Sequence, residues 1–143
     1  MPNHSVSLHS ADVFNAAGAG YAKSIGRTAD DFFQYAVKTF APSWGKPDSV
    51  SRIRVLRGMR RNLLAFSDWK FELIDSLENK VIGKFSRPYL SRLFKDNDSF
   101  YGVTLDEYEA GFRAFNRGIC EYLHLKYEDN IEGDWITFTI SKK

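Results

Sequence analysis

Two side chains with chemistry of their own, Cys120 and His124, lie four residues apart near the end of a helical pattern. This spacing would place a thiol and an imidazole on one helix face, where the imidazole could accept the thiol proton. The position also argues against that role, because the negative end of the helix dipole disfavours a thiolate and free cysteines are usually buried. We expect a structural Cys120. A small enzyme or biosynthetic-pathway accessory acting on a small hydrophobic substrate stays an alternative.

A second candidate group is cationic. Arg54, Arg57 and Arg61 follow one another at spacings of three and four, so they share one helical face. Guanidinium groups bind carboxylates and phosphates through paired hydrogen bonds, which would suit an anionic ligand or an acidic protein partner. The simpler alternative is a solvated helix face. With 20 basic and 18 acidic residues, the net charge of +2 disfavours a nucleic-acid ligand.

Neither the histidines nor the acidic residues form a metal-site pattern. Two of the three histidines, His4 and His9, fall in the first ten residues, which we predict to be flexible. Asp129, Glu132 and Asp134 lack the spacing of a calcium loop, and a hairpin turn explains them more simply. A single cysteine can form neither an internal disulfide nor a thiolate metal site. We therefore predict no metal and no cofactor.

Aromatic residues make up 15% of the chain, enough to fill a core or to line an apolar pocket. Many of them recur every three or four positions after a capping box formed by Thr104 and Glu107. Beside this stripe lies a track of small residues, Gly111, Ala114 and Gly118, which fits tight helix packing or space for a ligand. The predicted ligand-binding residues are Tyr108, Phe112, Phe115 and Tyr122, with Arg57 or Arg61 for an anionic group.

Five helices would position these residues, since apolar side chains recur there at helical spacing. Thr28 caps the second helix, and Pro42 is expected to end it, because proline pushes the preceding residue out of the helical region. Pro88 suits the first turn of the short fourth helix. The predicted helices cover residues 11–25, 29–41, 49–66, 88–94 and 105–122. The core-facing side of the first helix would consist of Val13, Phe14, Ala17, Tyr21 and Ile25.

Two hairpins complete the predicted elements. The first joins residues 70–77 to 80–85 through a tight turn in which Asn79 takes positive φ. The second joins residues 123–128 to 135–140 across an acidic loop. The expected fold class is α+β, with a four-stranded, largely antiparallel sheet of two hairpins and about five helices packed against it. We expect a flexible N-terminus, residues 1–10, and a single domain over residues 11–143.

The segment EAGFRAFNRGICEYLHLKYEDNIEGDWITFTI, residues 109–140, resembles the 4-vinyl reductase domain. The resemblance implies a small ligand-binding sensor domain, of a group related to subunits of vesicle-trafficking tethering complexes. Such domains commonly carry a cysteine in each closing strand, whereas this chain has Leu125-Lys126-Tyr127 and Trp135-Ile136-Thr137 there. The resemblance therefore implies an apolar ligand pocket or an interaction surface, without metal or thiol chemistry.

The leading functional prediction is a non-enzymatic small-molecule-binding or sensory domain, with an aromatic-lined apolar pocket for a small apolar or aromatic molecule. It could form a homodimer. Besides the small enzyme, a protein-interaction module that docks its arginine-rich helix on an acidic partner stays open. The chain shows no secretory signal and no run of about eighteen apolar residues, so we expect a cytoplasmic protein without a membrane span.

Overall fold

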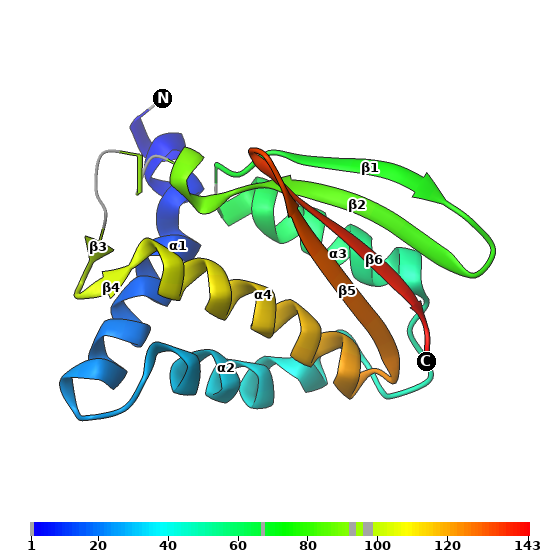
Figure 1. Ribbon diagram of the computed structural model, residues 1–143, viewed down its shortest axis with the longest axis horizontal. Coiled ribbons are helices and arrows are strands. Elements are labelled where there is room, and N and C mark those ends of the chain that lie inside the picture. Colours follow the sequence, from blue (N-terminus) through cyan, green and yellow to red (C-terminus); the bar gives the residue numbers. More distant parts are fainter. Residues whose placement is uncertain (1, 67, 92–93, 96–98) are drawn as a thin grey trace.

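The computed structural model describes residues 2–66, 68–91, 94–95 and 99–143 and has the predicted α+β architecture (Figure 1). The described helices are α1 (Pro2–Ser24), α2 (Ala29–Trp44), α3 (Arg52–Phe66) and α4 (Leu105–Tyr122), with a 3₁₀ turn η1 (Pro88–Leu90). The strands are β1 (Phe71–Ser76), β2 (Lys80–Ser86), β3 (Ser99–Phe100), β4 (Val103–Thr104), β5 (Leu125–Glu132) and β6 (Trp135–Lys142). In the described part of the chain, no helix combines the length and apolar character needed to cross a bilayer.

The main sheet confirms the predicted pairing of two hairpins. Its strand order is β1-β2-β6-β5, and each neighbouring pair is antiparallel. The hairpins join along β2 and β6, where Val81 lies opposite Ile140 and Phe85 opposite Ile136. These four side chains are buried, and the ring of Phe85 lies 5.5 Å from that of Phe112 on α4. Burial alternates along the central strands β2 and β6, so they present one apolar face to the helices, whereas the edge strand β1 is mostly exposed.

The helices α2 and α4 lie side by side (Figure 1) and contact each other through glycines. A Cβ atom at Gly111 would come within 2.1 Å of the Phe33 ring, and one at Gly118 within 2.7 Å of Val37. The small-residue track of α4 thus serves tight helix packing, and α2 fills the space that a ligand would need there.

Both helices begin at the predicted caps. Thr28 Oγ1 accepts a hydrogen bond from the Asp31 N–H at 3.0 Å, and Thr104 Oγ1 accepts one from the Glu107 N–H at 3.1 Å. Each acidic side chain bonds back to the N–H of its cap. Glu107 also accepts a bond from Lys23 at 2.8 Å, and this contact is the largest cause that lowers the pKa of Glu107. The cap of α4 therefore also holds the end of α1.

The buried side of α1 differs from the prediction. The helix begins at Pro2, before the expected start at residue 11. Three large side chains predicted to face the core are exposed: Phe14, Tyr21 and Ile25. The buried residues are Asp12, Ala16, Ala19 and Ala22. Close approach explains the difference, because a Cβ atom at Gly20 would lie 2.2 Å from the Tyr101 carbonyl oxygen, so a face of small residues is needed there. The flexibility expected for residues 1–10 stays a prediction.

Two helix predictions were wrong in detail. Pro42 lies inside α2, which continues to Trp44 and ends at Gly45, whose φ is 133°. A proline in the last turn removes only one backbone hydrogen bond, so packing can carry the helix past it. The predicted fourth helix is the short turn η1, so the described residues contain four α-helices rather than five. Its expected course crosses residues 92–93, which lie outside the described residues.

The turns of the two hairpins in the main sheet also differ from the prediction, and β3 and β4 pair separately in a small antiparallel sheet. The closing hairpin turns at Gly133, whose φ is 61°, so Asp129 and Glu132 lie in β5 and not in a loop. In the first hairpin, the Leu77 N–H donates to the Lys80 carbonyl at 2.8 Å. Asn79 is not among the described residues with positive φ. A glycine that accepts a left-handed backbone permits the tight turn of the closing hairpin.

Replacing Gly111 with alanine should destabilise the domain, although alanine is favoured over glycine by about 1 kcal/mol in an unhindered helix. The added methyl group would overlap the Phe33 ring, and overpacking of this kind costs about 1–3 kcal/mol. Urea denaturation of the two proteins measures the difference. A variant more stable than the wild type would show that α2 and α4 are not in tight contact at this glycine.

Candidate functional site

A cavity of about 330 Å³ lies where α1, α2, α3, β2 and α4 meet. Its wall is mainly apolar and aromatic, formed by Phe40, Trp44, Met59, Leu63, Phe85, Phe112 and Phe115. Polar groups enter it at a few points only, from Asp12, Asn15, Ser43, Asn62 and Asn116. This combination of an apolar wall with few polar groups is typical of small-molecule sites.

A buried carboxyl group forms part of the wall. Asp12 is 2% exposed and accepts two hydrogen bonds, from Tyr108 Oη at 2.6 Å and from Trp69 Nε1 at 3.0 Å. Burial raises the pKa of Tyr108 well above its ordinary value, and the Asp12 charge raises it further. The phenol therefore keeps its proton and donates a hydrogen bond to Asp12. The three side chains connect α1, α4 and the segment before β1.

The structure brings together only some of the predicted ligand-binding residues. Phe112 and Phe115 line the cavity. Tyr108 lies behind the wall, fully buried and bonded to Asp12. Tyr122 is 37% exposed and Arg57 is exposed, and neither is part of the lining. The predicted set is thus divided between the cavity, the core and the surface.

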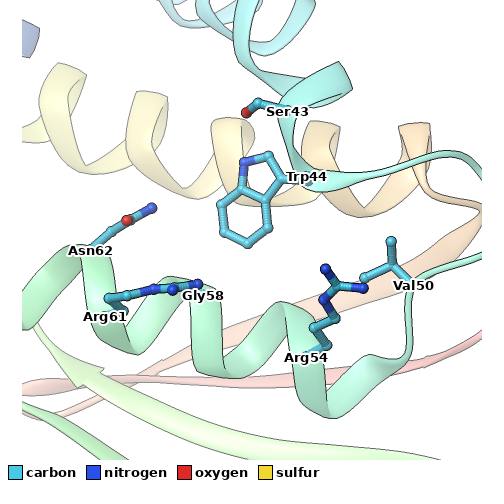
Figure 2. A pocket seen from close by; sticks show the side chains of 7 residues that line it. All are labelled: Ser43, Trp44, Val50, Arg54, Gly58, Arg61 and Asn62. Atoms are coloured by element: carbon cyan, nitrogen blue, oxygen red, sulfur yellow. The ribbon is translucent and has the colours of Figure 1, made fainter.

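The remaining predicted residue, Arg61, lines a second pocket of about 250 Å³ beside the cavity. Figure 2 shows the Trp44 ring standing over Gly58 of α3, with Arg61 and Arg54 on either side. Three residues line both this pocket and the cavity: Ser43, Trp44 and Asn62. The two spaces are therefore neighbours with a common wall.

Sequence reasoning missed two important lining residues, Asp12 and Trp44. A signal existed for Asp12, since it is the only acidic residue between positions 11 and 25, a stretch rich in alanine and glycine. A charge in the middle of such a stretch indicates a buried partner or a site. No comparable signal existed for Trp44, because it follows Pro42, where the helix was expected to end.

Cys120 and His124 do not form a nucleophile and base. Cys120 is buried, and burial raises the pKa of its thiol from 9.0 to about 12, with a smaller contribution from Glu121. His124 lies beyond the end of α4 with a φ of 63°, and its Nδ1 lies 2.8 Å from Asp48 Oδ2. The imidazole is therefore engaged by a carboxylate, and the thiol is held in its protonated form.

One acidic residue of the closing hairpin, Asp129, is held by arginines. Asp129 accepts two hydrogen bonds from Arg113, at 2.7 and 3.0 Å, and lies 3.6 Å from Arg117. The hydrogen bond to Asp129 is the largest cause that raises the pKa of Arg113. Within the described residues, no group of three His, Cys, Asp or Glu side chains could hold a metal ion. The geometry thus gives Asp129 a structural role between α4 and β5.

Comparisons with known proteins identify no family for this chain. No family model matches it, and no curated protein matches it. Among solved structures, it is similar to a crystal structure of a mutant H-NOX protein from K. algicida in the Fe(II) unliganded form. The TM-score is 0.37 and the identity 12%, over 85% of this chain and 67% of that chain. Similarity at this level carries no functional argument, and the resemblance to the 4-vinyl reductase domain stays a prediction.

Replacing Asp12 with asparagine should lower the free energy of unfolding by about 1–3 kcal/mol, the cost of leaving one buried donor without an acceptor. Asparagine offers a single carbonyl oxygen to two donors, Tyr108 Oη and Trp69 Nε1. Urea denaturation of Asp12→Asn, Tyr108→Phe and the double variant would measure the coupling. The double variant should lose less than the sum of the single losses; strictly additive losses would contradict the proposed network.

Cys120 should be inert toward thiol reagents in the native protein. A buried thiol with a pKa of about 12 carries almost no thiolate at neutral or mildly alkaline pH, and the thiolate is the reactive form. Labelling with a chromogenic disulfide reagent should be slow in buffer and complete in denaturant. Rapid labelling of the folded protein would contradict this prediction and support the alternative of an enzyme that uses the Cys120 thiol.

Proposed function

We propose that this domain binds a small, mainly apolar or aromatic molecule, as a non-enzymatic ligand-binding or sensory domain. The observation that carries the proposal is the cavity of about 330 Å³ with its aromatic wall and few polar groups. Five elements line this space, and concave sites with mainly apolar walls are where proteins usually bind small molecules. Burial of a ligand's apolar surface there would supply the main free energy of binding.

The size of the cavity limits the ligand. Small-molecule sites span about 300–1,000 Å³, and this one lies at the lower end. A molecule with one to three rings, or a chain of comparable volume, fits better than a large cofactor. The aromatic wall, with Phe85, Phe112 and Trp44 on different elements, would favour flat ligands through edge and face contacts.

The polar groups of the wall would orient such a ligand. Asp12 is held in place by Tyr108 and Trp69, so its position is fixed before binding. The Asn15 amide lies one turn further along α1, and Asn116 faces the cavity from α4. Because α1 contributes two of these groups, an occupied cavity would strengthen the docking of α1. That coupling would allow a sensory domain to report binding.

The thiol-based enzyme is a weaker candidate, because the Cys120 thiol is buried and stays protonated. Exposed arginines on α3 are compatible with an acidic protein partner, but no described contact favours that role over a ligand. The homodimer also stays a prediction.

A neutral probe, N-phenyl-1-naphthylamine, would test the proposal directly. Its fluorescence should rise and shift to the blue on binding to the wild type, because the probe leaves water for an apolar site. Ala11→Trp places a large ring in the lining and should weaken binding at least about tenfold, since a filled site offers no apolar area to bury.

Ala110→Trp is the matched control, because Ala110 is exposed on α4 and absent from the lining. It should bind the probe like the wild type. Asn62→Trp, at an exposed lining position, serves as a second blocking variant should Ala11→Trp unfold. If the wild type leaves the probe in water, or if all variants bind it equally, the cavity is not a ligand site.

A further inference from the structure

The pocket beside the cavity is built around one glycine. Trp44 packs onto Gly58 so closely that a Cβ atom there would lie 2.5 Å from Trp44 Cζ3. Arg54 precedes Gly58 by four positions and Arg61 follows it by three, so both arginines lie on the same side of α3 as the indole. Figure 2 shows their guanidinium groups on either side of the ring.

In the part of the chain that the structure describes, some arginines are already paired with carboxylates, whereas Arg54 and Arg61 are not. Arg87 and Arg113 are each held by a carboxylate, Glu109 and Asp129 respectively, at 3.1 Å or less. For Arg54 and Arg61, the described residues show no ion pair, and the lining of their pocket contains no acidic residue. Two cations without a neighbouring carboxylate attract an anion, and the guanidinium group fits planar carboxylates and sulfonates best.

The arginine pocket is continuous with the apolar cavity in its lining. Ser43, Trp44 and Asn62 line both spaces. A molecule that fills the cavity and passes the edge of Trp44 would therefore place its end group between the arginines. Apolar walls on one side and unneutralised cations on the other match a molecule with an apolar body and a charged end.

We propose that the cavity and the arginine pocket form one site for an amphipathic anion, an organic carboxylic or sulfonic acid with a compact aromatic or aliphatic body. The body occupies the cavity, Arg54 and Arg61 bind the acid group, and Trp44 contacts the junction between them. This inference rests on the proposed function and adds the chemical class of the ligand. In place of the predicted Arg57, which lies outside the pocket, the inference assigns Arg54 to bind the acid group.

Two probes that differ only in an acid group test the inference. N-phenyl-1-naphthylamine is neutral, and 8-anilinonaphthalene-1-sulfonate has the same ring system with a sulfonate added. The wild type should bind the sulfonate about tenfold more tightly at low salt, the effect expected of a charge-assisted hydrogen bond. Added salt should reduce this preference, because an exposed ion pair is screened, and should leave the neutral probe's affinity unchanged.

Two pairs of substitutions distinguish an effect of the arginine pocket on binding from an effect of the overall charge of α3. Arg54→Gln combined with Arg61→Gln should abolish the preference for the sulfonate and keep the affinity for the neutral probe. Arg57→Gln combined with Arg60→Gln removes the same charge from the same helix, at exposed positions outside the lining, and should keep the preference. Ala11→Trp should weaken the binding of both probes, because the ring system of each has to enter the cavity.

The outcomes distinguish this inference from the proposed function. If the neutral probe binds and the sulfonate shows no preference, the cavity is a ligand site and the inference is wrong. The inference is also wrong if the control pair of substitutions removes the preference, or if the sulfonate still binds fully to Ala11→Trp. If neither probe binds to the wild type, the proposed function fails and the inference fails with it.

Discussion

The burial of one carboxyl group constrains the rest of this structure. A carboxyl group removed from water costs several kcal/mol unless hydrogen bonds replace its hydration. Among the described residues, Tyr108 of α4 and Trp69 of the segment before β1 donate hydrogen bonds to Asp12. Because these donors belong to segments far apart in sequence, they fix where this part of α1 docks. That position places Asp12 and Asn15 in the wall of the cavity.

The helix α4 organises both the core and the cavity. One side packs against α2 through Gly111 and Gly118, where no larger residue fits. The aromatic stripe divides along its length: Tyr108 is fully buried, while Phe112 and Phe115 line the cavity. Core and cavity wall are therefore parts of one helix face, and Phe112 belongs to both, since its ring also contacts those of Trp69 and Phe85. The pocket with Arg54 and Arg61 adjoins this cavity, and Trp44 lines both.

Much of the fold could be predicted because local interactions determine it. Helix caps are such interactions: Thr28 as an N-cap identified the start of α2, and the capping box of Thr104 and Glu107 identified that of α4. Alternation of apolar and polar residues likewise identified β2 and β6. Periodicity failed for α1, where large apolar residues such as Phe14 are exposed and alanines are buried. The buried face of α1 is set by how closely neighbouring backbone approaches the helix, as at Gly20. The hydrophobicity of the residues does not contain this information.

The sequence by itself determined the α+β class, the two hairpins and the row of arginines on α3. Only the tertiary structure decided which residues meet. The cavity is lined from α1, α2, α3, β2 and α4, and its charged neighbour is Arg54 as well as the predicted Arg61, but not Arg57. Helical spacing places Arg54, Arg57 and Arg61 on one face of α3. Because α2 continues past Pro42, the indole of Trp44 packs on α3 between Arg54 and Arg61. These two arginines therefore line the pocket, and Arg57 does not. Such selection depends on packing between distant segments, which no local pattern contains.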